Sequence, residues 1–174
     1  MRKNKRWIMI FIMAIIPIVG IWILNNPGIM AQAFLNLGGM KEGEDFPMVH
    51  GEEVEGDSFH LESLKGKPYV VMVARIDCEV CKSSYPTLEN SKDLLKEANF
   101  VMIGKGGKEE YKQVKKDHDF SFPIVYADEQ IQKDLKIKVF PTFYFIDKNG
   151  KVMKRLDGYE KEKVLKLLNE WTKK

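Results

Sequence analysis

Cysteine and histidine are scarce in this chain, and acidic residues are missing from its N-terminal part. The 174 residues include two cysteines and three histidines, and no aspartate or glutamate precedes Glu42. Two cysteines are too few for a small secreted scaffold held together by disulfides. The three histidines lack the paired spacing of a zinc finger, so we expect no metal site and no cofactor.

The composition excludes three further classes of protein. Charged residues make up 30% of the chain, too many for a polytopic membrane protein, and hydrophobic residues make up 44%, too many for a disordered chain. The net charge of +3 comes from four basic residues within positions 1–6; without them, 24 basic residues face 25 acidic ones. The remaining chain has no basic excess, so we expect no nucleic-acid partner.

Residues 7–24 form an uncharged apolar run of 18 residues, close to the minimum length of a helix that crosses a bilayer. Trp7 and Trp22 stand near its ends, where indole rings favour the interface between water and lipid. Basic residues beside such a run stay in the cytoplasm. We therefore predict a cytoplasmic tip over 1–6, a single-pass transmembrane signal-anchor over 7–24 and an extracytoplasmic remainder.

The chain after the apolar run divides into a linker and one domain. Residues 25–44 are rich in glycine, asparagine and small residues, and 45–174 are enough to bury a core. The alternative to a retained anchor is a signal peptide cleaved after Ala33, since Ala31 and Ala33 fit the small-x-small pattern. Signal peptides have an apolar core of roughly 7–15 residues, so the longer run here favours retention.

Residues 45–174 alternate between short apolar runs and amphipathic or charged segments. The apolar runs predict strands over 69–74, 100–103, 122–126, 143–146 and 151–156. The other segments predict helices over 78–98, 108–116, 129–135 and 160–171. The sequence DKNG at 147–150 predicts a type I′ hairpin turn. This order predicts a three-layer α/β fold with a central mixed sheet and helices on both faces.

Both cysteines lie in one motif, Cys78-Glu79-Val80-Cys81, where a predicted strand gives way to a helix. The free N–H groups and the positive end of the dipole at a helix N-terminus stabilise a thiolate, which is the reactive form of cysteine. The second cysteine stands one helical turn further on, within reach of the first. The motif therefore predicts Cys78 as a nucleophile and Cys81 as the resolving thiol of a redox-active disulfide.

Three other interpretations of the cysteine pair are weaker. A structural disulfide across so short a loop would remove little entropy from the unfolded chain. A zinc site would need four ligands. Two inert, buried cysteines would both have to fall at a helix start by accident.

The stretch KGKPYVVMVARIDCEVCKSSYPTLE resembles the active-site segment of extracytoplasmic thioredoxin-like proteins of the TlpA/ResA type. In the same order, residues 44–67 resemble their N-terminal hairpin and 122–125 resemble a core strand. Residues 140–142 (FPT), followed by FYFIDKNGKV, resemble their cis-proline loop and terminal hairpin. The resemblance covers about 45–171, and it implies a thioredoxin-like fold and a thiol–disulfide oxidoreductase.

The resemblance also implies roles for two substrate-binding residues outside the cysteine motif. Pro141 matches the cis-proline that packs against the active-site disulfide. The backbone of Phe140 matches the segment that pairs with the extended chain of a substrate. The alternative for Pro141 is a trans-proline at a strand edge.

The chain departs from the family where relatives carry an acid near the cysteines. Met72 and Ser84 occupy those two places. Proton transfer would therefore need Asp77, Glu79 or water.

These observations predict a membrane-tethered, monomeric enzyme that reduces disulfides of exported proteins and receives electrons from a membrane-embedded thiol carrier. One alternative is a peroxidase on the same fold, but Val71 and Arg75 stand where its proline and threonine would precede the nucleophile. The other alternative is a copper-binding chaperone. It would space its cysteines by three residues and use a distant histidine, for which His118 is the candidate.

Overall fold

The computed structural model describes residues 38–173, together with 13, 15–17, 19–23, 25, 26 and 28. The predicted anchor over 7–24 lies partly outside these residues, and the cleavage site at 31–33 lies wholly outside them. Residues 13, 15–17 and 19–23 are helical. Among the described residues, no helix combines the length and hydropathy that a membrane span requires.

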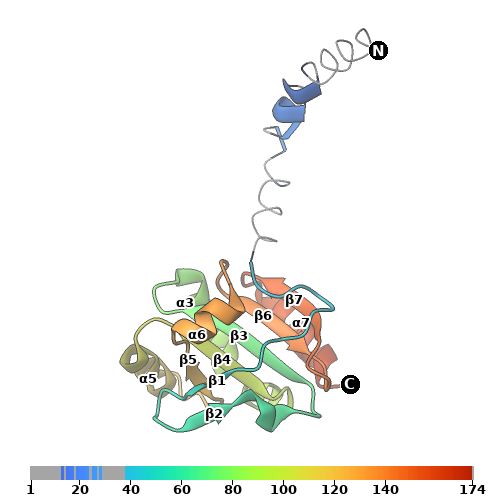
Figure 1. Cartoon of the computed structure of the whole chain (residues 1–174). Helices are drawn as coiled ribbons and strands as arrows, with labels where there is room; N and C mark the ends of the chain where they lie inside the picture. The colour runs from blue at the N-terminus through green and yellow to red at the C-terminus, as the bar shows by residue number, and fades with distance from the viewer. Residues whose placement is uncertain are drawn as a thin grey trace. The chain divides into compact units, whose positions relative to one another are not determined.

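A five-stranded mixed sheet forms the centre of the domain, in the order β5-β4-β3-β6-β7 (Figure 1). Its strands are β3 (Tyr69–Arg75), β4 (Phe100–Lys105), β5 (Ile124–Tyr126), β6 (Thr142–Ile146) and β7 (Val152–Asp157). The first three are parallel, and β6 and β7 run antiparallel to their neighbours. The central strand β3 is buried from Tyr69 to Ala74, as a continuous apolar run predicts for a strand covered on both faces.

Helices cover both faces of the sheet and form two cores (Figure 1). The face that carries Met72 packs against α3 (Glu79–Glu89), α4 (Lys92–Glu97), α5 (Lys108–Asp117) and α7 (Lys161–Trp171). The face that carries Val71 packs against α6 (Glu129–Leu135), the η1 turn (Leu61–Leu64) and a hairpin of β1 (His50–Glu52) and β2 (Ser58–His60). The predicted mixed sheet with helices on both faces is confirmed.

The single helix predicted over 78–98 is in fact two helices. The break falls at Asn90, the C-cap residue of α3, whose backbone N–H and side-chain amide both donate to the Pro86 carbonyl, at 3.2 and 2.6 Å. The strand predicted over 122–126 begins only at Ile124, because Pro123 lacks the N–H that a strand ladder needs.

The hairpin between β6 and β7 is confirmed, but its predicted type I′ turn is wrong. Such a turn needs positive φ at two residues, and in 147–150 only Gly150 has one, at 87°. The carboxylate of Asp147 accepts hydrogen bonds from the backbone N–H groups of Asn149 and Lys151, both at 2.9 Å. These bonds satisfy the loop without positive φ at Asn149, and the β6–β7 register shifts after Phe145.

The segment before β3 pairs with both outer strands of the sheet. Glu53 forms a bridge with Val125 of β5, and Asp45 forms one with Lys151, next to β7. Val152 of β7 exchanges two backbone hydrogen bonds with residues 43–44. The outer strands therefore leave few backbone groups unpaired at these points.

Candidate active site

Cys78 lies where the chain leaves β3 and enters α3. It is the N-cap residue of α3, with an extended backbone, and its sulfur accepts a hydrogen bond from the Cys81 N–H at 3.2 Å. Both cysteines are free thiols. The Cys78 side chain is half-buried and Cys81 is fully buried. Only the first sulfur is therefore accessible to another molecule.

The burial of Cys81 controls its chemistry. Removal from water, together with a smaller effect of the hydrogen bond with Cys78, raises the pKa of the Cys81 thiol to about 12. Cys81 therefore keeps its proton at neutral pH. A thiol in this state is poorly reactive until a partner draws its proton away.

The loop before β6 meets the cysteine motif, although the two are far apart in sequence. The Phe140–Pro141 peptide bond is cis, as predicted. The carbonyl oxygen of Phe140 lies 3.5 Å from the sulfur of Cys78, which donates to it. The structure thus brings together all four predicted site residues: Cys78, Cys81, Phe140 and Pro141.

The two predicted proton carriers, Asp77 and Glu79, are both engaged with basic side chains at the surface. Arg75 donates to Asp77, and Lys82 donates to Glu79 at 2.7 Å. The two carboxylate side chains are 69% and 84% exposed. No buried acid occurs among the residues that the structure describes. A proton from Cys81 would therefore have to pass through water or directly to the departing group.

Ser84 occupies a place where relatives have an acid. It is fully buried, and its hydroxyl donates to the Cys81 carbonyl at 2.6 Å. Met72, at the other such place, lies in the core of the sheet. Neither side chain supplies a titratable group to the site.

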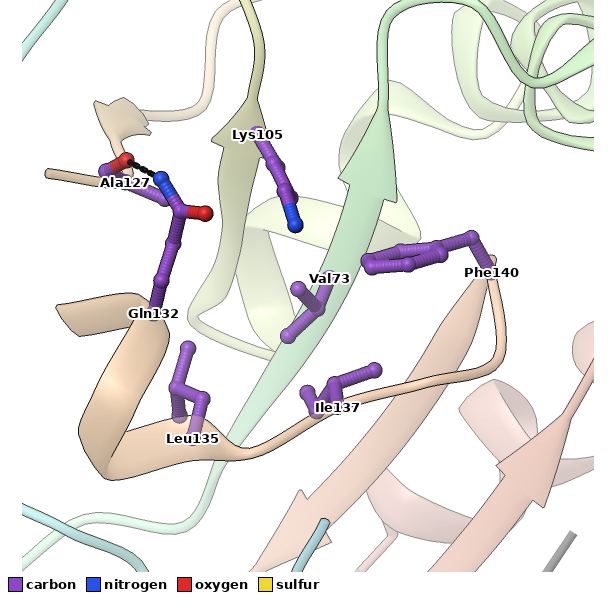
Figure 2. Close-up of a pocket in the computed structure, with 7 residues that line it drawn as sticks. All are labelled: Val73, Lys105, Ala127, Gln132, Leu135, Ile137 and Phe140. Carbon is purple, nitrogen blue, oxygen red and sulfur yellow. Dashed lines mark hydrogen bonds between the residues drawn. The ribbon is translucent and has the colours of Figure 1, made fainter. Parts of the chain in front are cut away.

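A cavity of about 30 Å³ lies behind Phe140, on the face of the sheet opposite to α3 (Figure 2). Val73, Leu135 and Ile137 form its apolar wall. Figure 2 shows Lys105 reaching into it from the end of β4, with Gln132 facing it from α6. The volume suits about two water molecules and is far below that of a small-molecule site. Nothing in the sequence pattern indicates that Lys105 and Gln132 meet here.

The two alternative functions find less support in this arrangement. The positions that a peroxidase motif would use are Val71, in the core, and Arg75, which lies over the ring of Phe140. The candidate copper ligand His118 instead packs against Tyr85 and lies 3.3 Å from Glu89. In residues 38–173, no group of three close metal ligands includes a cysteine.

Comparisons with known proteins agree with this geometry. The sequence model of the AhpC/TSA family matches residues 43–155. The chain is 28% identical over 169 residues to the thiol-disulfide oxidoreductase ResA of Bacillus subtilis, a match that covers 95% of this chain and 92% of that protein. It is 25% identical over 118 residues to the thioredoxin-like protein YneN of the same organism, covering 64% of this chain and 69% of that one.

Solved structures confirm the predicted fold. A thiol:disulfide interchange protein of the thioredoxin family from Chlorobium tepidum superimposes with a TM-score of 0.64 at 22% identity, over 76% of this chain and 99% of that one. A thiol:disulfide interchange protein from a Bacteroides species gives a TM-score of 0.66 at 18% identity, over 78% of this chain and 92% of that one. The domain therefore has a thioredoxin-like fold.

Proposed function

The chain belongs to the AhpC/TSA family, and on that premise we propose that it reduces disulfide bonds of exported proteins at the outer face of the cytoplasmic membrane. It is a thiol–disulfide oxidoreductase with a thioredoxin-like fold. The single observation that carries the proposal is the placement of Cys78. Its half-buried sulfur lies at the start of α3, bonded to the Cys81 N–H and close to the Phe140 carbonyl.

The first step is the attack of the Cys78 thiolate on one sulfur of a substrate disulfide. A mixed disulfide forms between Cys78 and the substrate, and the second substrate sulfur leaves as a thiolate. The Phe140 carbonyl lies beside the reacting sulfur, and the backbone of Phe140, fixed by the cis bond to Pro141, would hold the extended substrate chain there. Helix α3 stabilises the negative charge on the attacking sulfur through its N-terminal N–H groups.

In the second step, Cys81 attacks the sulfur of Cys78 in the mixed disulfide. Cys81 gives up its proton, which reaches the departing substrate thiolate directly or through water. The products are a substrate dithiol and a Cys78–Cys81 disulfide, so two electrons have passed from the enzyme to the substrate. The high pKa of Cys81 keeps this step from running early, because the thiol gains reactivity only when a thiolate nearby can take its proton.

The oxidised enzyme must then receive two electrons and two protons from a dithiol carrier. A membrane-embedded carrier fits an enzyme tethered by residues 7–24, since the tether would keep the two within reach of each other. The charge pattern of residues 1–6 supports a cytoplasmic N-terminus and a catalytic domain on the far side of the membrane. We propose a monomer, with exported disulfide-containing proteins as substrates.

Covalent trapping tests this proposal. In full-length Cys81→Ser protein the second step is blocked, so substrates should accumulate as mixed disulfides with Cys78. They would appear in non-reducing gels of whole cells and be identified by mass spectrometry after reduction. The matched control is Cys78→Ser, which keeps one cysteine but removes the accessible one. If folded Cys81→Ser protein traps no more than this control, the proposal fails.

The location has its own test. The chain contains only two cysteines, and only Cys78 is accessible, so a membrane-impermeant maleimide reports the side on which the domain lies. We expect intact cells to label wild-type protein and not Cys78→Ser. The mass of the mature protein then distinguishes a retained anchor from cleavage after Ala33. Labelling only after lysis would contradict an extracytoplasmic domain.

A further inference from the structure

Three side chains that have no part in the redox site meet at the β1–β2 hairpin. His50 and His60 are directly opposite each other in the register of the two strands. Their Nδ1 atoms lie 3.0 Å apart. Glu62, in the η1 turn that follows β2, lies 2.9 Å from Nε2 of His50 through its Oε1 atom. Three residue pairs in the hairpin and one short turn thus bring two imidazoles and a carboxylate together.

The distance between the two imidazole nitrogens suits a shared metal ion. Two nitrogens bound to one tetrahedral zinc ion, each at 2.0–2.1 Å, lie about 3.3 Å apart. The Nδ1 atoms need to separate by only a few tenths of an ångström to accept such an ion in place of the hydrogen that they now share. Neutral imidazole is a preferred ligand of borderline divalent ions such as Zn²⁺ and Cu²⁺.

Glu62 has the position of the carboxylate that commonly supports a metal-bound histidine. A carboxylate that accepts from the second ring nitrogen fixes the tautomer and leaves the first nitrogen free to bind the metal. Here Oε1 of Glu62 takes this place at Nε2 of His50, which leaves Nδ1 directed to His60. Its other oxygen, Oε2, is buried and has no hydrogen-bond partner among the described residues. All three residues offer ligand atoms within 4.8 Å of one another.

We infer that His50 and His60, positioned by Glu62, bind one divalent transition-metal ion of the Zn²⁺ or Cu²⁺ class. The His50 side chain is 58% exposed and His60 is also exposed, so an ion can enter without a rearrangement of the core. Water completes the coordination. A bound ion joins β1, β2 and the η1 turn, and it stabilises this corner of the domain. The inference rests on the hairpin alone and does not depend on the proposed function.

The test uses Zn²⁺ and the full-length chain in detergent, with Cys78→Ser and Cys81→Ser in the background, because thiolates also bind zinc. Competition with a chromogenic chelator should reveal one site per chain. His50→Gln and His60→Gln should each lower the affinity of this site for Zn²⁺ by about 10-fold or more, and Glu62→Gln should lower it by about 10–100-fold. Zn²⁺ at 100 times its Kd should raise Tm by about 5 °C or more in the background protein but not in His60→Gln.

The matched control is His118→Gln. His118 also lies beside a carboxylate, Glu89, but it has no second histidine, so its loss should leave the affinity unchanged. The metal-free Tm of each variant separates a binding defect from a folding defect, and Glu62→Gln should lose affinity while this Tm stays constant. Absence of saturable zinc binding, or equal binding by His50→Gln and the background protein, overturns the inference.

Discussion

The guanidinium carbon of Arg75 lies 5.4 Å from the centroid of the Phe140 ring, so the last residue of β3 holds the loop that faces the reactive sulfur. Arg75 also donates through Nε to Asp77, which directly precedes Cys78. One side chain thus links the entry to α3 with the loop that carries Phe140. This link is polar and partly exposed, whereas most of the surrounding contacts are apolar and buried.

Replacing Arg75 with alanine should lower the free energy of unfolding by about 1 kcal/mol, since a partly exposed cation–π contact and a surface ion pair are both lost. Disulfide reduction should slow because the Phe140 loop is less well held. Arg75→Lys keeps the charge but not the planar stacking, so its stability and its rate of disulfide reduction should lie between those of wild type and Arg75→Ala. Urea denaturation measures the stability, and steady-state kinetics measure the rate. The control is Lys82→Ala, which breaks only an exposed ion pair and should change the free energy of unfolding by less than about 0.5 kcal/mol. Equal losses of stability in Arg75→Ala and Lys82→Ala would contradict the role given to Arg75.

Alkylation of Cys81 should depend steeply on pH. In Cys78→Ser protein, burial still holds the pKa of Cys81 well above its ordinary value. The thiolate reacts and the thiol does not, so the modification rate should rise about tenfold for each pH unit between pH 7 and pH 10. Iodoacetamide labelling followed by mass spectrometry gives these rates. A plateau near pH 8.5, the value of a free cysteine, would mean that the thiol is not shielded as described.

Asp147→Ala should lower the free energy of unfolding by about 1 kcal/mol at pH 7, because two backbone N–H groups in the hairpin lose their acceptor. The hydrogen bond from the Lys151 N–H lowers the pKa of Asp147, so the ionised form favours folding. This contribution is complete above the unfolded value near 3.9 and is lost as the pH falls through the lowered folded value.

Urea denaturation of wild type and Asp147→Ala between pH 7 and pH 2 checks this relation. The difference in stability should shrink toward the acid end. Asp147→Asn keeps an acceptor oxygen and does not titrate, so its difference from Asp147→Ala should be the same at every pH. A constant gap between wild type and Asp147→Ala would refute the role of the charge.

Gly104→Ala should destabilise the domain by about 2 kcal/mol, since overpacking a well-filled core typically costs 1–3 kcal/mol. A Cβ at Gly104 would lie 2.6 Å from an atom of the Tyr111 ring, where β4 meets α5. Thermal and urea denaturation measure the loss. Tyr111→Leu removes the clashing ring, so the double variant should lose less stability than the sum of the two single changes. Additive losses would locate the strain elsewhere.

The sequence was most informative where a pattern repeats within one element. The unbroken apolar run of β3 and the helical spacing in α7 predicted those elements to within about one residue, because burial decides both the pattern and the structure. The prediction from sequence failed where the structure depends on the hydrogen bonds of a single side chain. One helix ends at Asn90, whose amide donates to the Pro86 carbonyl, and the Asp147 carboxylate accepts two backbone N–H groups in the turn. Such local bonds leave no periodic signal.

The site divides in the same way. Cys78, Cys81 and Pro141 were predictable, since a short motif and a family resemblance both identify them. The stacking of Arg75 on Phe140 and the pairing of His50 with His60 were not, because each depends on how separate strands align. Register is a property of the assembled sheet, and one sequence read in order does not contain it.

The pairing of residues 43–53 with both outer strands has a consequence for contacts between copies of this protein. Exposed strand edges are where sheets of neighbouring molecules join. By occupying backbone groups at Val125 and Val152, the lead-in segment caps the sheet at both borders. The stretch of chain that precedes β3 thus leaves less open strand edge on which the sheet of another molecule could extend.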